Sequence, residues 1–326
     1  MFAREKTEDA QGTSVRKEHV RLNFSDEVVR VNFTDAAIKA IELAGKAGNA
    51  LGAIVTPRPE LEERIERIPT RLGAHGVDPF GFDPQFVKKV VGPASWVYRS
   101  YFRCQTSGLE NLPEGRCLVI ANHSGQLPFD AAMLTLAAFL DREPPRYLRS
   151  MVERFVPATP YVSMFLARCG QILGTPENCK RLLEAEEGIL VFPEGVRGLN
   201  KTWHDRYKLQ RFGQGFMRLA LETNTPIVPA VVIGAEEQAP AFYNLPRLGR
   251  LFGMPALPVT PLHPLIPGLG LLPLPTRYRI AFGKPMTFEG DFNDEDETIN
   301  AKVEQVRAAL QQMITDGLAA REHIFW

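Results

Sequence analysis

The chain has 326 residues, enough to bury a full hydrophobic core in one large domain or two small ones. Lys and Arg together number 38, as do Asp and Glu, so the sequence lacks the basic excess of a nucleic-acid-binding protein, and we expect no nucleic-acid partner. The four cysteines lack CxxC spacing and the first residues lack the apolar core of a signal peptide, which indicates reduced thiols in a cytoplasmic protein.

Residues 1–70 differ in composition from the rest of the chain. The first 27 or so are charged and poor in aromatic residues, which favours a mobile tail. Helical patterns follow over residues 34–55, where three glycines weaken the pattern, and over residues 59–68, where Pro59 suits a helix start. We therefore predict an N-terminal extension over residues 1–70, partly disordered or helical, followed by one domain over residues 71–326.

The remainder of the chain alternates helix and strand signals, which predicts a single α/β domain with a mixed sheet flanked by helices. Its core is expected at about residues 85–290. Residues 86–102 combine an apolar stripe with flanking cations, so they form either a helix packed on the domain or an interfacial helix on anionic lipid. Strands are predicted at residues 117–121, 146–152, 170–173, 188–193, 227–234 and 277–283, and helices at residues 129–140, 159–168, 177–186, 212–222 and about 294–321.

No segment has the roughly 20 uninterrupted apolar residues that a membrane-spanning helix needs. The nearest candidate is residues 252–275, where recurring prolines would break such a helix. Two interpretations stay open for this segment. It is either a connector folded against the core or an apolar loop that contacts a membrane or covers a lipid-binding cleft.

Ionisable residues follow the strand predicted at residues 117–121. In an α/β domain, ligands bind where strands end and helices begin. Here Asn122 and His123 lie directly after the strand, and Asp130 lies at the start of the next helix. An imidazole can take a proton from a hydroxyl group, and a carboxylate on its other ring nitrogen fixes the tautomer. His123 and Asp130 are therefore either a catalytic pair or a structural turn and a helix-start acid.

A second ionisable loop follows the strand predicted at residues 188–193. It contains Glu194, Gly195 and Arg197, with a glycine on each side of the Val196-Arg197 pair. Glycines allow a ligand to approach the backbone, and a guanidinium group can form two hydrogen bonds with a phosphate. The alternative is a salt bridge at the surface.

The two loops together resemble the lysophospholipid and glycerolipid acyltransferase family of the PlsC type. The family has an Asn-His block ending in aspartate, a Phe-Pro-Glu-Gly block with a nearby arginine, and a later block centred on a proline in a strand. The resemblance covers roughly residues 85–290. The matching residues are Asn122, His123 and Asp130 in the first block, Phe192, Pro193, Glu194, Gly195 and Arg197 in the next, and Pro229 in the last.

This resemblance implies an O-acyltransferase of phospholipid metabolism. Such enzymes move a fatty acyl group from acyl-CoA or acyl-carrier protein to a hydroxyl of a lysophospholipid or glycerol phosphate type acceptor, here expected at the cytoplasmic face of a membrane, with peripheral attachment. The resemblance implies that His123 is the general base, that Asp130 supports it, and that the block from Glu194 to Arg197 binds the acceptor. No cofactor and no metal are expected.

Departures from the family pattern create further expectations. Six residues separate His123 from Asp130 where the family usually has four, so the pair must meet across a longer loop. The arginine usual in the family's second block is absent, and Arg168 or Arg181 is a candidate to replace it in binding the acceptor. Lys208 belongs to a cationic cluster with Lys201, Arg206 and Arg211, which either attracts phosphate or forms a solvated surface.

Two other functions remain open on the same residues. One is an acyl-thioester hydrolase that uses His123 and Asp130 to activate water. The other is a catalytically altered lipid-binding protein, an interpretation favoured by the longer spacing. The absence of a GxSxG motif after any predicted strand disfavours a serine hydrolase.

Overall fold

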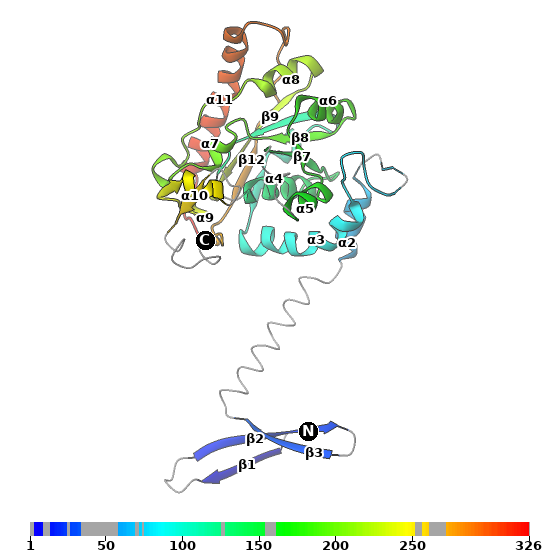
Figure 1. Cartoon of the computed structure of the whole chain (residues 1–326), viewed down its shortest axis with the longest axis vertical. Coiled ribbons are helices and arrows are strands. Elements are labelled where there is room, and N and C mark those ends of the chain that lie inside the picture. Colours follow the sequence, from blue (N-terminus) through cyan, green and yellow to red (C-terminus); the bar gives the residue numbers. More distant parts are fainter. Residues whose placement is uncertain are drawn as a thin grey trace. The chain divides into compact units, whose positions relative to one another are not determined.

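The structure is a computed structural model that describes residues 3–8, 14–24, 27–33, 58–68, 72–73, 75–124, 128–153, 161–251, 256–260 and 272–325. The chain divides into two compact units, residues 1–56 and residues 57–326 (Figure 1). The boundary therefore lies before the one predicted at residue 70. The difference arises because the helix predicted at residues 59–68 buries Leu61 and Ile65 in the core of the second unit.

The first unit contains a three-stranded antiparallel sheet in the order β1-β2-β3. The strands are β1 (Ala3–Glu8), β2 (Ser14–Phe24) and β3 (Glu27–Phe33). This differs from the mobile tail predicted from composition. Apolar residues alternate with polar ones along β2 and β3, which is the period of a strand, and the register pairs Val20 with Val31 and Leu22 with Val29. The helix predicted over residues 34–55 lies outside the described residues.

The second unit is built on a mixed sheet of 7 strands in the order β4-β12-β9-β5-β8-β6-β7. The five strands from β9 to β7 are parallel, β12 is antiparallel to β9, and β4 is parallel to β12. The mixed sheet flanked by helices is thus confirmed. Its strands are β4 (Gln105–Ser107), β5 (Cys117–Ala121), β6 (Leu148–Val152), β7 (Ile172–Leu173), β8 (Gly188–Val191), β9 (Ile227–Ile233) and β12 (Arg279–Phe282).

Helices surround this sheet and include every helix predicted for the domain. The longer ones are α2 (Pro59–Glu66), α3 (Pro84–Trp96), α4 (Phe129–Leu140), α5 (Val162–Arg168), α6 (Pro176–Glu184), α8 (Gly215–Thr223) and α11 (Asp296–Ala319). The helix predicted at residues 86–102 continues after α3 as η1 (Val97–Tyr101). Short elements that the sequence pattern missed are η2 (Leu109–Asn111), α7 (Val196–Leu199), η4 (Trp203–Asp205), α9 (Ala235–Gln238), α10 (Pro246–Leu251) and the hairpin of β10 (Tyr243–Leu245) and β11 (Leu257–Val259).

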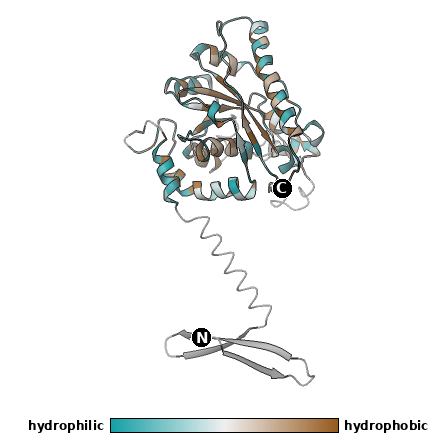
Figure 2. Ribbon diagram, turned by 180° about the vertical axis from the view of Figure 1, so that it is seen from behind, coloured by the Kyte–Doolittle hydropathy of each residue, from teal (hydrophilic) through white to brown (hydrophobic). Residues whose placement is uncertain are grey.

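The core lies on both faces of the large sheet. Successive side chains of a strand point to opposite faces, and all five residues of β5 are buried. Val119 packs in a cluster with α3 and α4, whereas Leu118 and Ile120 pack in a second cluster with α6, α8 and α11. Figure 2 shows the hydrophobic colour concentrated on these central strands. Because β5 is covered on both faces, its sequence is a continuous apolar run, and this run predicted the strand.

The helix predicted at residues 86–102 packs on the domain. Val87 and Val91 of α3 are buried in the core, and Asp83 caps the helix by accepting a hydrogen bond from the backbone N–H of Phe86 at 3.0 Å. Trp96 near its end remains partly exposed. Of the Pro-rich segment, β11 pairs with β10, while residues 252–255 and 261–271 lie outside the described residues.

Candidate active site

The loop that carries His123 leaves the sheet at the end of β5, and Asn122 fixes its starting point. The Asn122 side chain donates to the carbonyl oxygen of Val232 at 3.1 Å and accepts from the N–H of Val232 at 2.9 Å. Asn122 is completely buried, so both polar atoms need these partners. The Asn122 side chain thus extends the hydrogen bonding between β5 and β9 beyond the last residue of β5. It also fixes the direction in which the chain continues to His123.

His123 and Asp130 meet despite the longer spacing. The Nδ1 atom of His123 lies 2.7 Å from Oδ2 of Asp130, which is fully buried in the first turn of α4. The same oxygen accepts the N–H of Ser124 at 2.9 Å, and Oδ1 accepts the N–H of Ala131 at 2.8 Å. The carboxylate is therefore held by three hydrogen bonds. Its contact with Nδ1 leaves Nε2 of the imidazole as the nitrogen available to a substrate.

Phe192 and Glu194 support the histidine from the second loop. The Phe192 ring stacks on the imidazole with centroids 4.2 Å apart. One carboxylate oxygen of Glu194 accepts the backbone N–H of His123 at 3.0 Å, and the other accepts the N–H of Gln210 at 2.7 Å. Glu194 is only 2% exposed. The structure therefore places Glu194 in the scaffold of the histidine loop, whereas the resemblance implied contact with the acceptor.

The two glycines of the second loop are needed for different structural reasons. Gly195 adopts φ +56 and lines a cavity beside His123. A Cβ atom on Gly198 would lie 2.7 Å from Cβ of Glu194 and 2.9 Å from Cβ of His123. Gly198 is therefore required by the close packing of the two loops. Between them, Arg197 is exposed on α7 and donates to the carbonyl oxygen of Arg211 at 3.3 Å.

Arg168, a candidate for acceptor binding, has another partner. Its guanidinium group donates to Oδ2 of Asp83 at 2.7 and 3.1 Å and lies over the ring of Phe86 at 4.0 Å. These contacts tie α5 to the start of α3. Among the described residues that line the cavity at His123, Arg168 does not occur. Arg181, the other candidate, lies over the ring of Phe80.

The remaining predicted residues lie in three different environments. Lys208 pairs with Asp205 at the surface at 3.3 Å, as expected of a solvated cation. Lys201, predicted in the same cluster, is instead buried beside Glu194 and Glu236. Pro229 lies in the middle of β9 opposite Ile120 of β5, so it contributes to the sheet beneath the site.

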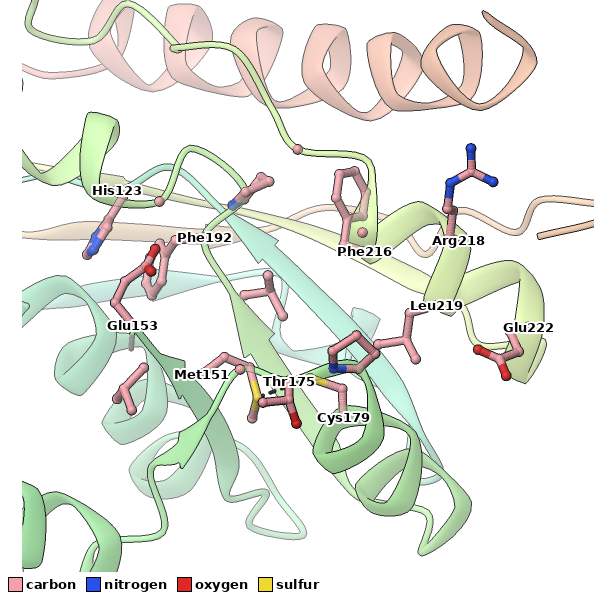
Figure 3. Close-up of a pocket in the computed structure, with 18 residues that line it drawn as sticks. His123, Met151, Glu153, Thr175, Cys179, Phe192, Phe216, Arg218, Leu219 and Glu222 are labelled. Atoms are coloured by element: carbon pink, nitrogen blue, oxygen red, sulfur yellow. Dashed lines mark hydrogen bonds between the residues drawn. The ribbon is translucent and has the colours of Figure 1, made fainter. Parts of the chain in front are cut away.

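A cavity of about 480 Å³ lies beside His123 and extends between α6 and α8. Figure 3 shows His123 and Phe192 at one end and Arg218 and Glu222 at the other. The apolar part of its wall is formed by Met151, Val152, Val191, Phe192, Phe216 and Leu219. Its size is in the usual range for small-molecule sites, and an apolar wall next to a basic imidazole suits a ligand with a long apolar portion.

In the part of the chain that the structure describes, no group of three or more His, Cys, Asp or Glu side chains could hold a metal ion.

The geometry agrees with comparisons with known proteins. The family model described as Acyltransferase matches residues 103–233, which include both loops. An uncharacterized protein of Mycobacterium leprae is 43% identical over 281 residues, which cover 83% of this chain and 77% of that protein. An uncharacterized protein of Mycobacterium tuberculosis is 42% identical over 260 residues, which cover 78% of this chain and 73% of that protein. The chain belongs to the glycerolipid acyltransferase family and is an O-acyltransferase of that type.

Two more distant proteins are similar to parts of this chain. A Bos taurus protein with the name "DGAT1/2-independent enzyme synthesizing storage lipids" is 28% identical over 133 residues, which cover 38% of this chain and 37% of that protein. Among solved structures, the 1-acyl-sn-glycerophosphate acyltransferase PlsC from Thermotoga maritima is 15% identical with a TM-score of 0.46, over 72% of this chain and 83% of that chain.

Proposed function

We propose that the protein transfers a fatty acyl group from acyl-CoA or acyl-carrier protein to a hydroxyl of a lysophospholipid or glycerol phosphate type acceptor, with His123 as the general base. The observation that carries this proposal is the contact of 2.7 Å between His123 Nδ1 and buried Asp130 at one end of a cavity with a largely apolar wall. An altered lipid-binding protein has no need for such a pair.

In the proposed reaction, Nε2 of His123 takes the proton of the acceptor hydroxyl as its oxygen attacks the thioester carbonyl. The negative charge of Asp130 stabilises the imidazolium and keeps its Nδ1–H oriented. When the tetrahedral intermediate collapses, the carbon–sulfur bond breaks and the imidazolium returns its proton to the leaving thiolate. The histidine is regenerated, and no covalent acyl-enzyme is formed.

The cavity supplies a place for the acyl chain. Its aliphatic and aromatic wall extends from the imidazole along α6 and α8, so a thioester carbonyl near His123 would leave the chain in apolar surroundings. Burial of methylene groups contributes roughly 0.8 kcal/mol each, so a long chain adds considerable binding energy. The polar side chains of Arg218 and Glu222 lie toward the far end.

Incubation with labelled acyl donors tests this function. Purified protein is mixed with acyl-CoA or acyl-carrier protein and a panel of lysophospholipids and glycerol phosphate, and the lipid and free fatty acid products are separated. Acyl transfer to an acceptor supports the proposal. Release of free fatty acid at the same rate with and without acceptors would identify a thioester hydrolase, and absence of both products would contradict catalysis.

Arg197 is proposed to bind the acceptor phosphate. It is exposed two residues after Gly195, which lines the cavity. Arg197→Lys keeps the charge but loses the planar pair of donors, so we expect the KM for a phosphate-bearing acceptor to rise about tenfold while the KM for the donor changes little. Steady-state kinetics with each substrate varied in turn measures this. An equal rise in both KM values would assign Arg197 a structural role.

Action at a membrane surface is part of the proposal. Among the described helices, none is long and apolar enough to cross a bilayer. Large apolar side chains are nevertheless exposed at α5, where Tyr161 is 84% and Met164 60% exposed and Val162 and Phe165 are also accessible. Residues 154–168 contain two arginines and no acid. Arg168 pairs with Asp83, but 43% of its side chain stays exposed, so the segment still suits an anionic lipid surface.

We therefore expect the protein to sediment with vesicles that contain anionic phospholipid. High salt should release at least part of the bound protein, because screening weakens the attraction of the basic residues. Sedimentation with and without salt, against neutral vesicles as the control, measures both contributions. Equal recovery in the supernatant with and without vesicles would contradict membrane binding.

A further inference from the structure

Lys201 occupies an unusual place for a lysine. Its side chain is buried, with the residue only 7% exposed, and its Nζ atom lies 2.8 Å from Oε1 of Glu236 and 3.5 Å from Oε2 of Glu194. Transfer of an ammonium group out of water is costly unless carboxylates compensate its charge. A lysine on the chain segment that follows the active-site loop is therefore held in the interior by two acids from different parts of the chain.

These three side chains connect the histidine loop to the end of the central strand β9. Glu236 lies in α9, directly after β9, and also accepts the backbone N–H of Tyr207 at 3.2 Å. At the other end, Glu194 holds the backbone N–H of His123. A displacement of Lys201 would therefore be transmitted to His123 through a single carboxylate.

The charges of the cluster favour an ammonium group in the middle. Burial raises the pKa of Glu236 to about 7, although Lys201 beside it favours the carboxylate. Burial alone would disfavour the charged form of Lys201, but the carboxylates of Glu236 and Glu194 hold its pKa above the usual value. Lys201 thus stays charged, and without it Glu194 and Glu236 would be two buried acids with no cation between them.

We propose that Lys201 is a positioning residue, whose ammonium group keeps Glu194 in the orientation that accepts the hydrogen bond from the His123 backbone and so holds the imidazole at its end of the cavity. The effect on acyl transfer rests on the proposed function. The effect on the geometry of His123 does not, and it can be measured without a substrate.

The geometric test uses protein labelled with ¹⁵N at histidine, which contains 6 such residues. The cross-peak of the His123 backbone amide is assigned by its loss in His123→Asn. Lys201→Met should move or broaden this cross-peak, because the hydrogen bond to Glu194 changes. Lys284→Met, which removes an exposed lysine, should leave it in place. An unmoved His123 cross-peak in folded Lys201→Met protein would overturn the proposal.

The kinetic test uses the same variants under conditions in which the wild-type enzyme is active. Misplacement of a catalytic group by about 1 Å can cost on the order of 100-fold, so kcat of Lys201→Met should fall about 10- to 100-fold with little change in either KM. Lys201→Arg should recover part of the loss by restoring the charge. Wild-type kcat in folded Lys201→Met would overturn the positioning role, whereas an inactive wild-type enzyme with a shifted cross-peak in the variant would contradict the proposed function alone.

A variant that fails to fold does not end the test. Glu236→Gln keeps the shape of the side chain and removes one charge from the ion pair with Lys201. It should shift the His123 cross-peak and lower kcat in the same direction as Lys201→Met, by a smaller factor. If Glu236→Gln lowers the melting temperature but leaves the cross-peak and kcat at wild-type values, the cluster stabilises the fold without positioning His123.

Discussion

Replacement of His123 with alanine should lower kcat by about 10²- to 10⁴-fold, which is the usual contribution of a positioned general base. The imidazole lies at one end of the cavity, and Asp130 and Phe192 fix its orientation. Alanine removes the proton acceptor, but the apolar wall that would hold the acyl chain remains. We therefore expect KM values to change much less than kcat when acyl transfer is measured with each substrate varied.

Controls separate this loss from unfolding. His123→Ala should keep the wild-type circular dichroism spectrum, because the bond between Glu194 and the backbone N–H of residue 123 does not need the imidazole. His204→Ala is the matched variant, since His204 is exposed in η4, and its kcat should stay near the wild-type value. Near-normal kcat in His123→Ala, with wild-type spectrum, would remove His123 from the mechanism.

Local sequence was sufficient to predict where His123 and Asp130 lie in the fold but not the geometry of their contact. A histidine that follows a continuous apolar run had to lie at the end of a buried strand, and an acid at the start of the next helix had to lie nearby. The longer loop concealed the contact, because its closure depends on hydrogen bonds that Asp130 accepts from the N–H groups of Ser124 and Ala131. The role of Asn122 was also hidden, since its partner Val232 is 110 residues away in the sequence.

The charged residues show where sequence reasoning fails. Lys201 and Lys208 belong to one cationic stretch, yet Lys201 is buried between acids and Lys208 is exposed. Arg168 was predicted near the acceptor but pairs with Asp83. Long side chains take partners from distant parts of the chain, and spacing along the sequence carries little information about them. Glu194 likewise binds the backbone of His123, a contact that no local pattern predicts.

Periodicity predicted the buried strands and the amphipathic helices of the second unit. It failed for short elements, such as the edge strand β4 and the hairpin of β10 and β11, each with 3 residues per strand. A strand this short has too few residues to show alternation, and its pairing is decided by its neighbours. In the first unit, charged composition obscured an alternation that is present in β2 and β3.

Asp130→Asn should cost kcat a factor similar to that of His123→Ala, about 10²- to 10⁴-fold, although asparagine has nearly the same shape. One oxygen of Asp130 accepts from Ser124 N–H and contacts His123 Nδ1, and the other accepts from Ala131 N–H. An amide has a single oxygen, so in either orientation its NH₂ group faces a backbone donor. If the NH₂ group faces His123, it donates to Nδ1, and the imidazole then carries its own proton on Nε2. In that tautomer Nε2 cannot accept the proton of the substrate hydroxyl.

The double variant tests whether the two residues act as one unit. If Asp130 acts through His123, then His123→Ala with Asp130→Asn should be little slower than either single variant, because members of one catalytic unit are not additive. The measurement is kcat for all four proteins, with thermal unfolding as the control for stability. Losses that multiply would show independent roles. Near-normal kcat in Asp130→Asn together with a lowered melting temperature would reduce Asp130 to a helix-start residue, because the strain against Ser124 and Ala131 would then affect the fold without affecting the imidazole.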